Sequence, residues 1–204
     1  MVKKSNDLIA TRTTLLRRLK DWQDESSWQD FFDTYWNLIY SVALKAGLNE
    51  GEAQDAVQET MISVAKHMPN FKYDPTVGSF KGWLLQMTRW RILDQIRRRE
   101  LQPGEQVTPH TYLMEKVVDP VSKALDVLWD AEWEAHLLDA ALSNVKRRLD
   151  PQKYQIFDFC VNKEWPAEKV AATFGISVNQ VYLAKHRVTE LISEEVKRLE
   201  EKII

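Results

Sequence analysis

The chain has 204 residues, of which 44% are hydrophobic and 28% charged, a composition typical of a globular protein with one large domain or two small ones. Six glycines and seven prolines exclude a collagen-like chain, no apolar run reaches the roughly 18 residues of a membrane-spanning helix, and a single cysteine excludes an internal disulfide, so we expect a cytoplasmic protein without membrane insertion. The formal net charge of −2 excludes a uniformly cationic nucleic-acid coat, although local basic surfaces remain compatible with it.

The first part of the chain has the residue spacing of helices. Apolar residues recur at helical intervals over residues 28–46, and Gly47 supplies a stop signal. The face that we expect to be buried contains Trp28, Phe31, Phe32, Tyr35, Ile39, Val42, Ala43 and Ala46. Asn49 can cap the next helix, with Glu52 three residues later, and this second helix should end near Met68.

A loop, a basic helix and a linker follow. Residues 69–79 hold two prolines and a glycine beside two aromatic residues, which predicts an ordered loop. Residues 80–99 return to helical spacing, and from Lys81 onward they contain six bases and one acid. From Glu100 to about Pro120 the sequence has three prolines, one glycine and little periodicity, so this stretch is the best candidate for a linker.

Helical spacing resumes over residues 121–149. Asp150 and Pro151 begin a short helix that should end near Asn162, and Pro166 opens another. Because no stretch alternates as a strand does, the predicted fold is all-α, with two small helical domains joined by a flexible linker. The predicted domain, linker and second domain are 1–100, 101–121 and 122–204.

The segment PAEKVAATFGISVNQVYLAKHR, residues 166–187, has the pattern of a helix-turn-helix. Gly175 lies where the turn needs a positive φ, Ala171 is small where the helices cross, and Ser177 with Gln180 predicts a capping box. The outward face of the second helix contains Asn179, Gln180, Tyr182, Leu183, Lys185, His186 and Arg187. Amide and cationic side chains can bind base edges and phosphates, which favours DNA binding over an ordinary helical hairpin with a solvated face.

The near-zero net charge conceals two segments of opposite charge. Residues 50–59 hold four acids and no base, and Glu52, Asp55 and Glu59 lie along one side of a helix. Such a pattern alone is more often a solvated helix face than a binding site. The basic helix combines its arginines with Trp83 and Trp90, a mixture that suits single-stranded nucleic acid. The alternative is that both rings belong to the core, which is favoured for Trp83.

Three motifs in register carry a family resemblance. They are EAQDAVQETMISVAK, then FKYDPTVGSFKGWLLQMTRWRILDQIRRR, then the helix-turn-helix. In this order they resemble a bacterial RNA polymerase sigma factor of the sigma-70 family, of the short, two-domain extracytoplasmic-function type. The resemblance covers about residues 25–100 and 135–195, and no sequence remains for the additional domains of larger sigma factors.

The resemblance implies a partner for each surface. Core RNA polymerase would bind Asp55, Gln58 and Glu59. The −10 promoter element would be captured and melted by Phe71, Lys72, Tyr73 and Asp74, lining a pocket for a flipped base, and by Arg89, Trp90, Arg91, Arg97 and Arg98 along the strand. The −35 element of promoter DNA would be read by Ser177, Asn179, Gln180, Tyr182, Lys185, His186 and Arg187. An anti-sigma factor is a further family expectation that no residue here supports.

The chain also departs from the family pattern. Trp90 replaces the usual Asn and either stacks on a base or fills a gap, and Tyr182 and Ala184 replace frequent cations. The end of the linker and the helix that follows it are unusually acidic, with Asp119, Asp126, Asp130, Glu132, Glu134 and Asp139. Two interpretations of these acids stay open at this point: they mimic nucleic acid near the polymerase active-site channel, or they solvate a helix.

No enzymatic motif accompanies these patterns. The histidines His67, His110, His136 and His186 are widely spaced, and the chain has neither a glycine-rich phosphate loop nor a nucleophile elbow. We therefore expect no enzyme, cofactor or metal. The predicted function is promoter-specific transcription initiation by a sigma factor; the alternatives are a free-standing helix-turn-helix regulator that binds duplex DNA without polymerase, and a helical adaptor protein.

Overall fold

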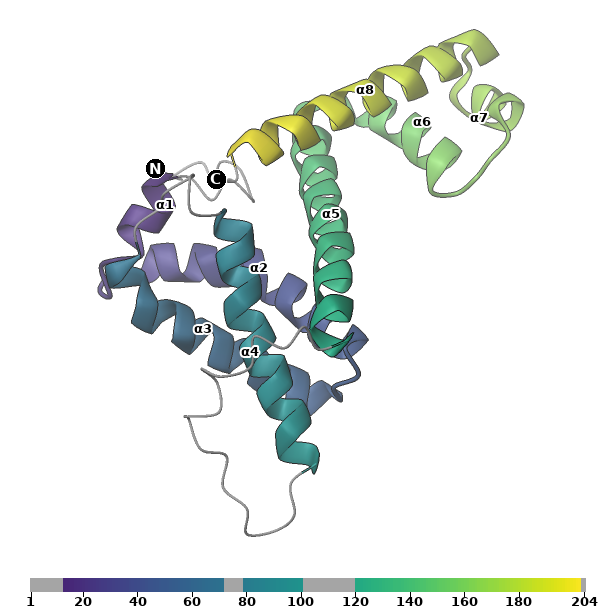
Figure 1. Cartoon of the computed structure of the whole chain (residues 1–204). Coiled ribbons are helices and arrows are strands. Elements are labelled where there is room, and N and C mark those ends of the chain that lie inside the picture. Colours follow the sequence, from purple (N-terminus) through teal and green to yellow (C-terminus); the bar gives the residue numbers. More distant parts are fainter. Residues whose placement is uncertain (1–12, 72–78, 101–119, 203–204) are drawn as a thin grey trace. The chain divides into compact units, whose positions relative to one another are not determined.

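The computed structural model describes residues 13–71, 79–100 and 120–202, and the regular structure of these ranges is entirely helical (Figure 1). Their contacts divide them into an N-terminal unit, residues 13–135, and a C-terminal unit, residues 136–202. The all-α prediction is confirmed. Within the described ranges, no helix combines the length and apolarity needed to cross a bilayer.

The N-terminal unit begins with a short helix, α1 (Thr13–Arg18), and the longer α2 (Glu25–Lys45). Asp24 caps α2 by accepting hydrogen bonds from the Ser27 amide, at 3.1 Å, and from the Arg18 guanidinium, at 2.7 Å. The hydrogen bond from Arg18 holds the pKa of the Asp24 carboxyl at about 2. After α2 the chain turns at Gly47, whose φ of +92° favours a residue without a side chain.

Helices α3 (Glu50–His67) and α4 (Phe80–Glu100) pack together and against α2 (Figure 1). The predicted capping box is present, because the Asn49 side chain accepts from the Glu52 amide while the Glu52 carboxylate accepts from the Asn49 amide. A 3₁₀ turn, η1 (Met68–Asn70), ends α3 where Pro69 was expected to end it. The bounds predicted for both helices are therefore confirmed to within one or two residues.

Aromatic and aliphatic side chains of α2 and α4 form the centre of this core. Phe31 and Tyr35 are fully buried and contact Phe80, with ring centroids 6.2 and 5.7 Å apart. The expectation that Phe32 lies in the same buried face is wrong, because its side chain is 42% exposed. A helix turns 100° per residue, so Phe32 points away from the side that Phe31 buries.

The long helix α5 (Pro120–Arg148) contributes to both units. Its first turns belong to the N-terminal unit, since Trp129 is fully buried there and Trp133 stacks on Tyr35 at 6.1 Å. The predicted linker lies outside the described residues, apart from its last two, which are helical. The division found in the structure falls after Ala135, further along the chain than the predicted boundary, because these indole rings pack on the first unit.

The C-terminal unit continues with three shorter segments of the predicted order: α6 (Pro151–Val161), α7 (Ala167–Phe174) and α8 (Val178–Lys202). Its core is formed by Ile156, Val170, Ala171 and Val181. Between α7 and α8, Gly175 has a φ of +65°, as the predicted turn requires.

Residues predicted to begin the helices of the C-terminal unit also behave as expected. Asp150 accepts hydrogen bonds from the first amides of α6. Ser177 and Gln180 exchange the two hydrogen bonds of a capping box, at 2.8 and 3.3 Å. Helices α7 and α8 therefore form the helix-turn-helix that the sequence predicts.

Candidate functional site

The predicted acidic face of α3 has two parts. Asp55 and Gln58 are exposed, and Asp55 has no ion pair with any described residue. Glu59 instead binds the neighbouring helix, with its carboxylate 2.8 Å from the Arg98 guanidinium and 3.8 Å from that of Arg91. Asp55 and Gln58 are thus the exposed members of the predicted set, while Glu59 connects α3 to α4.

Glu52, two turns earlier on α3, has the same connecting role. The Arg99 guanidinium donates to its carboxylate and also to the backbone carbonyl of Gly47, at 3.2 Å. The hydrogen bonds from Arg99 and from the Asn49 amide lower the pKa of Glu52. Half of the acidic segment is therefore neutralised by the basic helix within the same unit.

An apolar pocket, which the sequence did not predict, adjoins the exposed side of α3. It has a volume of about 540 Å³ and is lined by Trp22, Glu25, Trp28, Gln29, Phe32, Met61, Ile62 and Ala65. Ile62 lies one turn after Gln58 on the same exposed stripe of α3, and Trp22 stacks on Trp28 at 5.6 Å. Large exposed apolar side chains gathered in one place are typical of a surface that binds a protein.

The signal for this pocket was present in the sequence in a weak form. Ile62 falls outside the most regular apolar stripe of its helix, Trp22 precedes α2, and Phe32 was expected in the buried face of α2. Only the packing of α2 against α3 brings them to one place.

Most cations of the predicted DNA-binding helix α4 have partners inside the N-terminal unit. Arg91 donates to the Ser63 hydroxyl at 2.8 and 3.0 Å, and Arg98 bonds Glu59 and Asp94. Arg89 forms an ion pair with Asp126 of α5. Their assignment to promoter DNA stays a prediction, and any strand they bind has to share them with these acceptors.

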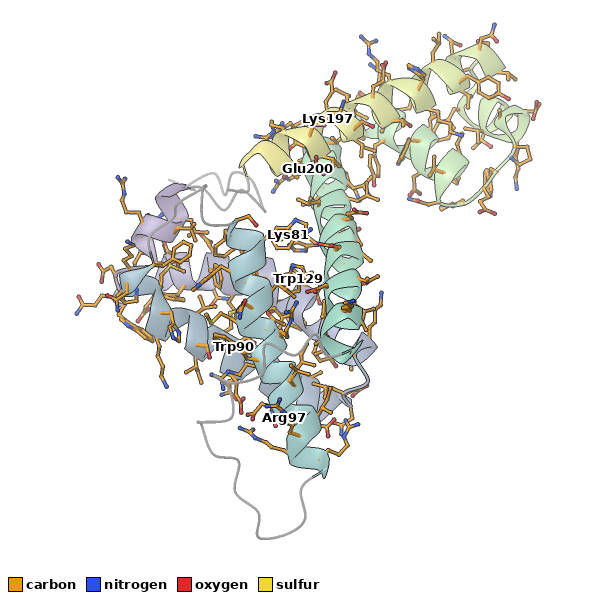
Figure 2. All side chains as sticks on the ribbon, in the orientation of Figure 1. Lys81, Trp90, Arg97, Trp129, Lys197 and Glu200 are labelled. Atoms are coloured by element: carbon orange, nitrogen blue, oxygen red, sulfur yellow. The ribbon has the colours of Figure 1, made fainter. Side chains whose placement is uncertain are left out.

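Two further members of the predicted set lie on α4 (Figure 2). Trp90 is 36% exposed and has no ring contact with the described residues, so its indole is partly available to a ligand. Arg97 is half-buried. Of the two alternatives for Trp90, stacking on a base is therefore favoured over filling a gap in the core.

The loop before α4 is described only at its ends. Phe71 is half-buried, with its ring 4.5 Å from that of Trp83 and 6.3 Å from that of Phe80. Lys72, Tyr73 and Asp74 lie outside the described residues. The ring of Phe71 belongs to an aromatic cluster at the start of α4, and the pocket for a flipped base stays a prediction.

The acids of α5 also have partners. Asp126 pairs with Arg89, Asp130 lies 2.6 Å from the Lys81 ammonium, and Glu132 pairs with Lys45 of α2. Glu134 and Asp139 are exposed, and Asp119 lies outside the described residues. In this structure, three of the acids after the linker therefore bind cations of the N-terminal unit.

The recognition face of α8 presents its side chains to solvent. Each predicted −35 residue is exposed: Ser177, Asn179, Gln180, Tyr182, Lys185, His186 and Arg187. Tyr182 is 57% and Leu183 70% exposed, whereas Val181 and Val188 are buried on the opposite side. Gln180 uses its amide oxygen in the capping box, which leaves its amide N–H groups for another acceptor.

A buried polar network, absent from the sequence prediction, supports α8. The Glu195 carboxylate accepts from Arg198 at 2.8 Å and from the Asn144 amide at 2.9 Å, and Arg148 lies 3.5 Å away. Hydrogen bonding from Arg198 and Asn144 lowers the pKa of Glu195 despite its burial. The described residues contain no group of three or more His, Cys, Asp or Glu side chains placed to hold a metal ion.

The family model of sigma-70 region 2 matches residues 31–102, which include most of α2 and all of α3 and α4. Curated relatives extend the match: the ECF RNA polymerase sigma factor SigE of Mycolicibacterium smegmatis is 28% identical over 177 residues, covering 87% of this chain and 64% of that protein. Residues 31–102 of the chain are thus similar to sigma-70 region 2. The curated relatives are sigma factors of the extracytoplasmic-function type.

A second curated relative is ECF RNA polymerase sigma factor SigF of Caulobacter vibrioides, 28% identical over 149 residues, with 72% of this chain and 73% of that protein covered. The match to SigE spans less than two thirds of that relative's length. Among solved structures, SigE of Rhodobacter sphaeroides in complex with the anti-sigma ChrR has 18% identity and a TM-score of 0.36, covering 89% of this chain and 94% of that one. The RsbN–BldN complex has 14% identity and a TM-score of 0.35, covering 88% and 97%.

Proposed function

We propose that this chain is a sigma factor that binds core RNA polymerase, directs it to promoters through the −10 and −35 elements, and helps to open the DNA. The observation that carries the proposal is the presence, in one chain, of a sigma-70 region 2 match over α2 to α4 and a capped helix-turn-helix with an exposed polar face. The polymerase supplies the catalysis, so the sigma factor itself is not an enzyme. It acts in the cytoplasm, and an anti-sigma factor is a candidate for its control.

The proposed polymerase surface is the exposed stripe of α3. Asp55 and Gln58 supply polar contacts, and Ile62 continues the stripe at the edge of the apolar pocket. Glu59 contributes mainly by holding α3 against α4 through Arg98. A rigid helix pair that presents two polar groups and an apolar pocket suits a preorganised protein interface.

The proposed −10 surface is the outer side of α4 and the loop before it. Trp90 supplies an exposed ring, and the arginines of α4 supply positive charge for the strand backbone. Extruding one base from a duplex costs a few kcal/mol, and stacking on an aromatic ring returns about 1–3 kcal/mol per base. Melting is therefore feasible once polymerase holds the promoter.

The proposed −35 surface is the face of α8 that begins after Ser177. Asn179 can bind an adenine edge, Arg187 can bind guanine or phosphate, and the exposed Leu183 can contact a thymine methyl group. The major groove of a DNA duplex accommodates one helix. Helix α8 could enter it with this exposed face, while α7 and the turn support its other side.

In-vitro transcription with purified core polymerase tests the proposal directly. The full chain should produce promoter-specific transcripts from genomic fragments of its own bacterium, and core polymerase alone should produce none at those sites. The variant Asp55→Arg is a matched negative control. Absence of specific transcripts from every fragment, combined with tight binding of one duplex by the sigma factor alone, would instead establish a free-standing regulator.

A further inference from the structure

We propose that the first turns of α5, residues 123–135, form a removable cover over α4 that competes with promoter DNA for Lys81 and Arg89. The proposal rests on the proposed function, because it concerns access to the −10 surface. It assigns to the acids of α5 a role that the sequence left open between mimicry of nucleic acid and simple solvation.

The cover is anchored by buried aromatic side chains. Trp129 is fully buried and Trp133 is 3% exposed, with their ring centroids 5.8 Å apart. Trp133 also stacks on Tyr35 of α2 and lies beneath the Lys81 ammonium, 5.7 Å from it. Figure 2 shows Lys81 and Trp129 between α4 and α5. This apolar contact holds α5 in place when no ligand is present.

The charges of the cover match those of the surface beneath it. Asp126 and Asp130 are one turn apart on α5, and they pair with Arg89 and Lys81, two turns apart on α4. A third pair, Glu132 with Lys45, fixes the cover to α2. Each of these three carboxylates pairs with a cationic side chain. Together the pairs fix the position of α5 along the unit more closely than apolar contact alone would.

These carboxylates occupy the donors that a nucleic-acid strand needs. Phosphate oxygens bind guanidinium and ammonium groups through the same charge-assisted hydrogen bonds that Asp126 and Asp130 accept here. A strand that uses Lys81 and Arg89 must displace both acids. The cover and the strand are therefore alternative ligands of one surface.

The pairs remain open to competition because their acids are exposed. The Asp126 and Asp130 side chains keep 47% and 63% of their accessible surface, so water, salt and phosphate all reach them. Arg98 and Arg99 differ, since they pair with Glu59 and Glu52 of α3, which is packed along α4. Displacing α5 leaves those α3–α4 pairs intact, so the cover can open without disrupting the helix pair beneath it.

Removing the two acids tests the competition. The double variant Asp126→Asn/Asp130→Asn should bind a labelled single-stranded oligonucleotide more tightly, in the absence of polymerase, than the unaltered chain does. The oligonucleotide carries the −10 region of a promoter that the wild-type holoenzyme transcribes. One exposed ion pair corresponds to a factor of about 1.4 to 5 in an equilibrium constant, so the two together predict about two- to twenty-five-fold tighter binding.

The matched control is Glu134→Gln/Asp139→Asn, which changes the net charge equally on exposed positions of the same helix. Measured by fluorescence anisotropy, this control should bind the oligonucleotide with nearly the affinity of the unaltered chain. The change in net charge alone should produce only a small gain. Equal affinities for the two double variants would overturn the cover, because general electrostatics would then account for the effect.

A measurement on the unaltered chain keeps the proposal testable if the acid variants unfold. Hydroxyl-radical footprinting should oxidise Trp129 and Trp133 severalfold faster in the open promoter complex than in the free sigma factor, since both rings are buried in the cover. Unchanged oxidation in a transcribing complex would overturn the cover and leave the proposed function standing. Failure to transcribe any promoter would instead overturn the proposed function.

Discussion

The N-terminal unit and α8 of the C-terminal unit use their charged residues in opposite ways. In the N-terminal unit, Glu52 and Glu59 of α3 bind Arg99 and Arg98 of α4, and the acids of α5 bind the cations that remain nearest to them. On the first turns of α8, the polar and cationic side chains face solvent. Charge segregation in a sequence therefore indicates an accessible ligand surface only where no complementary segment of the same chain packs against it.

The largest expected difference between the two regions is in packing. Phe80→Ala should lower the free energy of unfolding of the N-terminal unit by about 3–5 kcal/mol, because a fully buried ring that contacts Phe31 and Tyr35 leaves a cavity. Leu183→Ala is the matched change on α8 and should have an effect within about 0.5 kcal/mol, since its side chain is 70% exposed. Denaturant titration measures both changes. Equal losses of unfolding free energy in the two variants would contradict the expected difference between the buried core and the exposed face of α8.

The next effect concerns the buried carboxylate of Glu195 on α8. Glu195→Gln should destabilise the C-terminal unit by about 1–3 kcal/mol at neutral pH, because Arg198 and Arg148 lose their carboxylate. The folded-state pKa of Glu195 is lowered, so its stabilisation is present above the unfolded-state pKa and is lost as the pH falls through the folded-state value. The difference between the variant and the unaltered chain should therefore shrink in acid; a constant difference would contradict the ionic origin of the effect.

A substitution on the exposed face should change recognition without changing stability. Arg187→Ala should reduce discrimination between the correct and a substituted −35 sequence by about 1–3 kcal/mol if the guanidinium binds a base. A uniform loss of affinity for all sequences would place Arg187 on a phosphate instead. Competition binding of the holoenzyme to a panel of promoter duplexes measures the difference, with thermal unfolding as the stability control.

The smallest expected effects distinguish Asp55 from Glu59, the two acids of α3 that were predicted to bind core polymerase together. Glu59→Gln should lower unfolding free energy by about 0.2–1 kcal/mol, because it weakens half-exposed pairs with Arg98 and Arg91. Asp55→Arg should leave stability unchanged and weaken binding to core polymerase, since its carboxylate has no partner among the described residues. Unaltered polymerase affinity of the Asp55→Arg variant would return this face to a solvated one.

Local features of the fold were predictable from the sequence because their causes are local. The Asn49–Glu52 and Ser177–Gln180 capping boxes join residues three positions apart, and Gly175 alone meets the turn's need for a positive φ. The exposed face of α8 followed from the same periodicity. Helical spacing and the residues that end each helix were therefore enough to predict both the fold class and the helix-turn-helix.

Features that depend on which helices meet could not be predicted in this way. The pairs of Glu59 with Arg98 and of Asp130 with Lys81 join residues far apart in sequence, and so does the Asn144–Glu195 contact. The apolar pocket arises because Phe32 and Ile62 lie on different helices. A single helix period shows which side a residue faces, and it does not show what covers that side.

By itself, the sequence determined the all-α class, the bounds of α3 and α4, the turn at Gly175 and the family resemblance, because each depends on short-range spacing or on motifs in order. The tertiary structure alone decided that Asp55 and Gln58 stay exposed while Glu59 is engaged, and that Trp129 and Trp133 bring the acids of α5 onto the basic helix. The physical reason is that a charge acts on its spatial neighbours, and packing of the apolar faces chooses those neighbours.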